Sequence, residues 1–169
     1  MSREEAETAR GTWTPPGALE RRAILRGAKT IAVVGASSKP NRASHFVLSY
    51  LRSSSTDYEV WPVSPREDEI LGLEVYKSLA DLPGTPDIVD VFRKPDDLPA
   101  VAEEAVEAGA GAFWAQLGLH SDDAVRIAHE AELDVVTNRC VKIEHARFFG
   151  GLNLVGMNTG VITSRRTIG

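Results

Sequence analysis

The stretch that decides the fold is Thr30-Ile31-Ala32-Val33-Val34-Gly35-Ala36-Ser37-Ser38, an apolar run that stops at glycine and small hydroxylated residues. Its apolar residues do not alternate with polar ones, which is typical of a strand buried on both faces in a parallel sheet. Gly35 permits close backbone approach to a ligand, and the serines can donate to phosphate at a helix N-terminus. A plain glycine turn with a serine helix cap explains the same residues.

The same strand–helix unit recurs along the chain. Further apolar runs predict strands over residues 58–63, 86–92, 112–116 and 134–137, and helical spacing predicts helices over 18–28, 97–108 and 122–131. A helical face at Phe46, Val47, Tyr50 and Leu51 separates the first two strands. This alternation implies right-handed crossovers and a parallel sheet covered by helices on both faces. The predicted fold is a single doubly wound α/β domain with a five-stranded parallel sheet.

The expected organisation has three parts. Residues 1–29 form an N-terminal extension with an amphipathic helix, 30–149 form the domain, and 150–169 form a C-terminal arm or tail. An arm docked on a second subunit would make a homodimer, whereas a loosely ordered tail would not.

Composition excludes several classes of protein. The chain has 169 residues, 43% of them hydrophobic, so a largely disordered protein is excluded. The formal charge is 19 − 24 = −5, which argues against a general nucleic-acid binder. Cys140 is the single cysteine, so no internal disulfide can form. The start lacks the apolar run of a signal peptide, and glycines and asparagines interrupt the uncharged stretch Phe148–Ser164. We therefore expect a cytoplasmic protein without membrane partners.

Basic residues follow the predicted strands. In an open α/β sheet, ligands bind outside the carboxyl ends of the strands, near the point where the strand order reverses. Local cations at such an edge of an acidic protein indicate an anionic ligand, most simply a phosphorylated nucleotide. The cations concerned are Arg42, Arg66, Arg93, Lys94 and Arg139.

The first loop lacks the usual dinucleotide fingerprint. Gly35, Ser37 and Pro40 occupy the three glycine positions of G-x-G-x-x-G. The second strand ends in Val63-Ser64-Pro65-Arg66, where an acidic residue would be expected to bind a ribose diol. A basic residue there suits a phosphorylated ribose, which leaves NADP and coenzyme A (CoA) as ligands. Arg66 is equally well explained as a solvated loop charge beside acidic residues 67–69.

Motifs over residues 31–145 occur in an order that resembles the stand-alone CoA-binding domain proteins. These are small Rossmann-like proteins similar to the CoA-binding domain of the succinyl-CoA synthetase α subunit. The motifs include Val33-Val34-Gly35-Ala36-Ser37, Asn41-Arg42-Ala43-Ser44, Val63-Ser64-Pro65, Ile70-Leu71-Gly72, Asp87-Ile88-Val89-Asp90-Val91-Phe92-Arg93, Trp114-Ala115-Gln116-Leu117-Gly118 and Asn138-Arg139-Cys140-Val141-Lys142-Ile143-Glu144-His145.

The resemblance implies that CoA or an acyl-CoA binds at the carboxyl edge of the sheet. It assigns the phosphates to the first loop and next helix start, the adenosine end to the second loop and the pantetheine arm to the fourth. Asn138 departs from the Asp that is as common there, and Ser64 departs from Asn. The candidate binding residues are Gly35, Ala36, Ser37, Ser38, Lys39, Arg42, Ser44, Ser64, Pro65, Arg66, Phe92, Arg93, Gln116, Leu117, Gly118, Asn138, Arg139 and Cys140.

Catalytic and metal-binding patterns are missing from the sequence. The synthetase that the chain resembles uses a phosphorylated histidine in a further domain, which we do not expect here. His45 and His120 fall near strand ends, His129 is expected at the surface, and His145 in a structural helix role. No histidine pair has metal-ligand spacing. We expect a CoA-binding protein without chemistry of its own; the alternatives are an NADP-dependent oxidoreductase and an interaction domain with a vestigial cleft.

Cys140 has two interpretations. It follows a basic residue at a strand end, so a thiolate able to form a mixed disulfide with CoA is one hypothesis. Packing under the sheet edge is the other, and it is favoured. Trp61 and Trp114 lie within predicted strands and are expected in the core.

Overall fold

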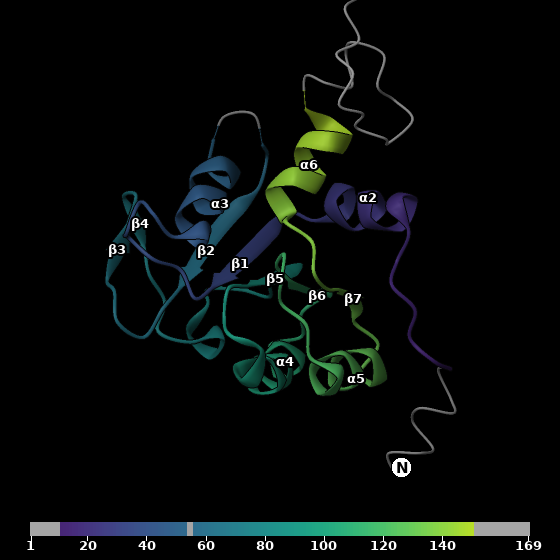
Figure 1. Ribbon diagram of the computed structural model, residues 1–169. Helices are drawn as coiled ribbons and strands as arrows, with labels where there is room; N and C mark the ends of the chain where they lie inside the picture. Colours follow the sequence, from purple (N-terminus) through teal and green to yellow (C-terminus); the bar gives the residue numbers. More distant parts are fainter. Residues whose placement is uncertain (1–10, 54–55, 151–169) are drawn as a thin grey trace, which may run out of the picture.

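Five parallel strands form the centre of the molecule (Figure 1). The computed structural model describes residues 11–53 and 56–150. Its elements, with η marking short 3-10 turns, are α2 (Ala18–Gly27), β1 (Thr30–Val34), α3 (Ala43–Leu51), β2 (Glu59–Val63), β3 (Glu69–Ile70), β4 (Leu73–Glu74), η1 (Leu79–Asp81), β5 (Ile88–Val91), η2 (Pro95–Asp97), α4 (Leu98–Glu107), β6 (Ala112–Ala115), α5 (Asp122–Glu130), β7 (Asp134–Val136) and α6 (Val141–Phe149).

The strand order is β2-β1-β5-β6-β7, and every neighbouring pair is parallel. From β1 the chain first adds β2 on one side and then returns to add β5 on the other. The order therefore reverses between β1 and β5, which is where ligands bind in doubly wound folds. The predicted doubly wound α/β fold with a five-stranded parallel sheet is confirmed.

Helices cover both faces of this sheet. Figure 1 shows α2, α3 and α6 on one face and α4 and α5 on the other. Alternate residues of β1 explain the two layers: Ile31 and Val33 pack in the first core, and Ala32 and Val34 in the second. Because both faces are buried, residues 31–34 of the strand are all apolar, as the uninterrupted apolar run predicted. Trp61 and Trp114 are buried, as expected.

The stretch after β2 is more ordered than the loop that the sequence predicts. Strands β3 and β4 pair antiparallel across Leu71 and Gly72, whose φ angles are 53° and 78°. Two consecutive positive φ angles are typical of a two-residue hairpin turn that matches the twist of its strands. Val63 and Tyr76 then form an isolated bridge that joins this segment to the end of β2.

Parts of the expected organisation lie outside the described residues. Residues 1–10 and 151–169 are among them, so the C-terminal arm and a homodimer built through it stay predictions. The amphipathic helix of the N-terminal extension is present as α2. Among the helices of the described residues, none has the length and apolar character needed to cross a membrane.

Candidate functional site

The loops that follow β1 and β5 touch through their backbones at the point where strand order reverses. Gly35 has a φ of +84°, and a Cβ atom on it would lie 2.6 Å from the carbonyl oxygen of Phe92. The Phe92 N–H donates to the Val34 carbonyl at 2.8 Å, and the N–H groups of Gly35 and Ala36 donate to the Val63 carbonyl at 3.0 and 3.2 Å. Glycine is required here for both reasons, the positive φ and the close approach. The ends of β1, β2 and β5 thus form one connected floor.

Helix α3 opens at this floor with an uncapped N-terminus. Arg42 occupies the N-cap position with extended backbone, its own side chain makes no capping hydrogen bond, and the first turn of the helix holds no acidic residue. Ser37 Oγ accepts a hydrogen bond from the Lys39 N–H at 3.1 Å, and His45 Nδ1 lies 3.2 Å from the Ser37 carbonyl oxygen. These contacts order the loop that leads into α3. A helix N-terminus in this state attracts anions through its N–H groups and its dipole.

The loop after β2 packs against the first loop through Glu67. Its carboxylate accepts from the Ser38 N–H, at 2.8 Å to one oxygen and 3.1 Å to the other, and from the Ser38 hydroxyl. Ser64 is buried, and its Oγ accepts from the Arg66 N–H at 3.3 Å. Glu67 is absent from the residues predicted for this site, because the sequence places it only among acidic neighbours of Arg66.

Lys77 fixes the backbone of this second loop. Its Nζ donates to the Glu67 carbonyl and to the Asp68 carboxylate, both at 2.7 Å. The hydrogen bond and charge of Lys77 lower the pKa of Asp68. Glu67 and Asp68, although adjacent, therefore point their carboxylates at different partners.

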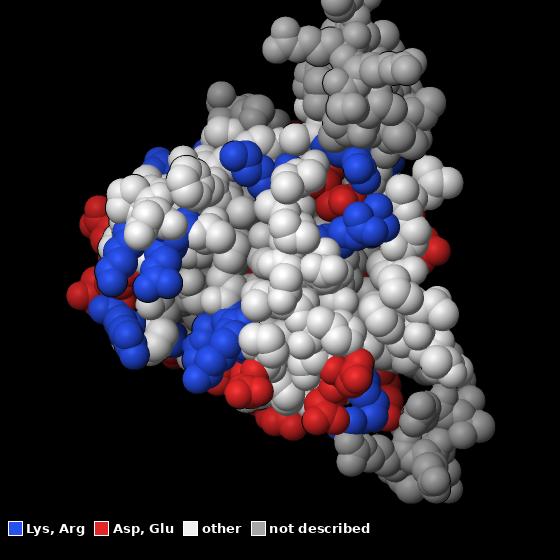
Figure 2. Space-filling model, in the orientation of Figure 1, with Lys and Arg blue, Asp and Glu red and all other residues white. Residues whose placement is uncertain are grey.

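Four cations near the strand ends are exposed, and in the described part of the chain no ion pair engages them. They are Lys39, Arg42, Arg66 and Lys94. Figure 2 shows basic side chains grouped on the side that carries β3 and β4, and acidic side chains over α4 and α5. Exposed cations therefore do gather near the strand ends of this acidic protein. Two of the five predicted cations, however, form ion pairs within the protein.

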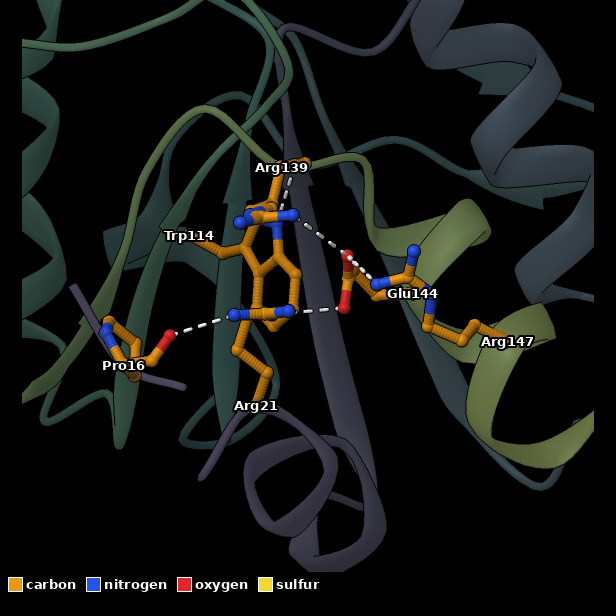
Figure 3. Close-up of polar contacts among 6 residues, drawn as sticks. All are labelled: Pro16, Arg21, Trp114, Arg139, Glu144 and Arg147. Atoms are coloured by element: carbon orange, nitrogen blue, oxygen red, sulfur yellow. Dashed lines mark hydrogen bonds and ion pairs between the residues drawn. The ribbon is translucent and has the colours of Figure 1, made fainter. Parts of the chain in front are cut away.

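Those two cations are Arg93 and Arg139. Arg93 pairs with Asp97 at 3.1 Å. Arg139 lies 3.6 Å from Glu144, on the side of the molecule where α2 meets α6 (Figure 3). Its carbonyl oxygen accepts from the Trp114 indole N–H at 2.8 Å. Arg139 was predicted as a ligand contact, and the structure places its guanidinium beside a buried carboxylate.

The loops after β6 and β7 bond to each other and to α6. Gln116 is buried, and its Oε1 accepts from the Val141 N–H at 3.1 Å, which caps the start of α6. The Gly118 N–H donates to Asn138 Oδ1 at 2.7 Å. The side-chain oxygens of Gln116 and Asn138 thus accept hydrogen bonds from the protein itself. Leu117, next to Gln116 in the same loop, is 64% exposed. Asn138 has a φ of 57°, which asparagine tolerates better than most residues.

Cys140 and the histidines take mainly structural positions. Cys140 is the N-cap residue of α6 and packs against the core beneath α3 and α6, in agreement with the packing interpretation. His145 is buried in α6, its Nδ1 lies 2.7 Å from the Tyr50 hydroxyl, and burial lowers its pKa. His120 lies 2.7 Å from Asp122. Within the described residues, no group of three or more His, Cys, Asp or Glu side chains has a metal-binding arrangement.

An open parallel sheet with connected loops at its reversal point defines a Rossmann-like α/β domain. The chain belongs to the CoA-binding domain family, whose model matches residues 29–146. The resemblance inferred from the motifs is therefore confirmed.

Relatives of this chain occur alone and within larger enzymes. Uncharacterized protein YneT of Bacillus subtilis is 42% identical over 131 residues, which cover 78% of this chain and 96% of that protein. The α subunit of acetate–CoA ligase (ADP-forming) II of Pyrococcus furiosus is 31% identical over 123 residues, covering 67% of this chain but 27% of the subunit. This chain therefore spans about a quarter of that ligase subunit.

Solved structures show the same division. A hypothetical protein from Pyrococcus horikoshii superposes with a TM-score of 0.74 at 37% identity, covering 81% of this chain and 97% of that one. The dinucleotide-forming acetyl-coenzyme A synthetase 1 of Ca. Korarchaeum cryptofilum superposes with a TM-score of 0.57 at 28% identity, covering 65% of this chain and 26% of the synthetase.

Proposed function

We propose that this protein binds CoA or an acyl-CoA at the carboxyl edge of its sheet, over the loops after β1 and β5, without chemistry of its own. The observation that carries the proposal is the uncapped N-terminus of α3, which opens beside Gly35 at the reversal of strand order. This feature lies within the segment that the CoA-binding family model matches.

The ligand would lie along the edge from phosphate to thiol. Its pyrophosphate would meet the N–H groups at the start of α3, where the helix dipole and Arg42 favour negative charge. Exposed Arg66 in the loop after β2 suits the phosphate on the ribose. The pantetheine arm would then pass Phe92 and the exposed Leu117, whose apolar surfaces match its uncharged chain.

No bond-making step is part of the proposal. His45 and His145 both make contacts within the protein, to Ser37 and Tyr50. The ligases among the relatives are much longer than this chain, and their reactions are properties of those proteins. The proposed role is that of a carrier, sensor or partner subunit.

Calorimetric titration with CoA and with NADP tests the ligand. We expect saturable binding of CoA and none of NADP. Arg42→Ala is expected to weaken CoA binding by about 1.5–3 kcal/mol, the range for a charge-assisted hydrogen bond. Arg26→Ala is the matched control, because Arg26 is exposed on α2, which precedes the opposite, amino end of β1. Binding of NADP without response to CoA contradicts the proposal, and equal CoA affinities of the two variants place Arg42 outside the site.

A further inference from the structure

The side chain of Glu67 reaches from the loop after β2 to the loop after β1. Its carboxylate accepts from the Ser38 N–H at 2.8 Å and from the Ser38 hydroxyl. Backbone N–H and hydroxyl groups in a loop between a strand and a helix are donors that hold phosphate oxygens. The negatively charged Glu67 carboxylate already accepts from both of these donors of Ser38.

We propose that Glu67 is an internal anion that a ligand phosphate must displace from the loop after β1, an inference that rests on the proposed function. Glu67 then acts as an affinity- and specificity-determining residue of the CoA site. It keeps the loop ordered and its donors satisfied in the absence of ligand, and it leaves them when a phosphate arrives.

The surroundings of Glu67 permit this movement. Lys77 holds the Glu67 carbonyl oxygen at 2.7 Å, so the backbone stays in place while the side chain rotates. Lys77 directs its charge to the carboxylate of Asp68. Among the described residues, no ion pair engages the Glu67 carboxylate, which is held by Ser38 alone.

The Glu67 carboxylate and a ligand phosphate cannot bind the Ser38 donors at the same time. A carboxylate and a phosphate repel each other, and a donor that serves one is lost to the other. The affinity measured for a phosphorylated ligand is then the intrinsic affinity reduced by the fraction of molecules whose loop is open. A ligand without phosphate does not bind the Ser38 donors, so its affinity is not reduced by Glu67.

Titration of Glu67→Gln with CoA, 3′-dephospho-CoA and pantetheine tests the inference. The substituted amide has an oxygen that can accept from Ser38, but it lacks the charge that repels phosphate. We expect Glu67→Gln to bind CoA and dephospho-CoA roughly tenfold more tightly than the wild type, because one charge-assisted contact no longer competes. Pantetheine, which has no phosphate, is expected to bind both proteins equally.

Asp68→Asn is the matched control. It removes one negative charge from the neighbouring residue, whose exposed carboxylate bonds Lys77 and does not touch the loop after β1. We expect its CoA affinity to stay within about twofold of the wild type. An equal gain in both variants would assign the effect to net charge and overturn the inference.

The remaining outcomes separate this inference from the proposed function. If wild type binds CoA and Glu67→Gln binds it equally or more weakly, the inference fails and the function stands. If neither protein binds CoA, the proposed function fails, and inorganic pyrophosphate tests Glu67 by itself. Pyrophosphate should then raise the Tm of Glu67→Gln more than that of the wild type, and equal shifts overturn the inference.

Discussion

Asp90 is a carboxyl group in the middle of the central strand β5, opposite Val33 on one side and Trp114 on the other. It is 0% exposed, and neither of its side-chain oxygens has a hydrogen-bond partner among the described residues. Burial raises the pKa of this carboxyl well above its ordinary value. An ionised carboxylate at this position would be strongly unfavourable, so burial favours the protonated form of Asp90.

Asp90 therefore makes stability depend on pH. The contribution of the protonated group is complete below the pKa of the unfolded chain and is lost as pH rises through the raised pKa of the folded state. In Asp90→Asn the titrating group is absent. We expect its free energy of unfolding, relative to wild type, to increase by up to about 1.4 kcal/mol per pH unit above the unfolded pKa.

Urea unfolding of both proteins across pH measures this difference. Asp68→Asn is the control, because that carboxylate is exposed and its pKa is lowered. Parallel pH profiles for wild type and Asp90→Asn would contradict a protonated Asp90.

Individual side chains show what the sequence can and cannot predict at this scale. The strand-end position of Gln116 was recognised, but its acceptor is bonded to the Val141 N–H, 25 residues further along the chain. The contact of Glu67 with Ser38 spans 29 residues and joins two loops. Residue type and spacing identify which edge a side chain occupies. They do not identify its partner there, because that depends on how separate loops fold together.

Helix α2 is fastened to α6 by a buried ion pair. Arg21 Nε lies 3.0 Å from a Glu144 carboxylate oxygen, and Arg21 also donates to the Pro16 carbonyl at 2.8 Å (Figure 3). Both side chains are under 10% exposed, at 7% and 3%. Arg139 and Arg147 approach the other carboxylate oxygen at 3.6 and 3.8 Å. Because α2 precedes the segment that the family model matches, this pair joins a helix outside that segment to the matched part of the chain.

Arg21→Ala is expected to destabilise the protein by about 3 kcal/mol. Removing one partner of a buried ion pair costs roughly 3–5 kcal/mol, since the other charge stays buried. The low end applies because Arg139 and Arg147 still neutralise Glu144. Denaturant unfolding measures the loss, and Arg26→Ala on the exposed surface of α2 should change stability by less than about 0.5 kcal/mol. Equal stabilities of the two variants would show that the ion pair does not anchor α2.

Helices and strands whose apolar residues show a clear pattern along the sequence were predicted, and short elements without such a pattern were missed. Helix α2 was expected over 18–28 and is observed over Ala18–Gly27, and strand β1 has the predicted bounds. The hairpin of β3 and β4 was not predicted, because two-residue strands are too short to show alternation. Its turn requires positive φ angles at Leu71 and Gly72. Leucine seldom adopts such an angle, so the sequence did not predict the turn.

At the scale of the whole molecule, the sheet order determines where the candidate site lies. The alternation of strands and helices predicts a parallel sheet but leaves the order of its strands open. The observed order puts β1 beside β5, and so brings Gly35 against Phe92 although 57 residues separate them in sequence. The candidate residues after β1, β2 and β5 meet there, whereas those after β6 and β7 bond mainly to one another and to α6.

Charge is also distributed unevenly over the molecule. The net charge is −5, yet exposed Lys39, Arg42 and Arg66 follow β1 and β2. CoA carries several negative charges on its phosphates. The net charge of the protein and its local cations therefore predict opposite effects on CoA binding. The net charge repels the ligand, and the local cations attract it. Screening decides between them, because the Debye length is about 10 Å at 0.1 M salt and contacts act over shorter distances than the charge of the whole protein.

We expect local attraction to dominate, so that the Kd for CoA rises with salt. Between about 50 and 500 mM salt we expect a weakening of roughly 3- to 10-fold, because exposed cations at the binding edge are progressively screened. Calorimetry at fixed pH across this range measures the trend, and pantetheine, which lacks phosphates, should show little change. A Kd that falls with salt would mean that repulsion by the acidic exterior outweighs Lys39, Arg42 and Arg66, and that CoA binds away from the edge they follow.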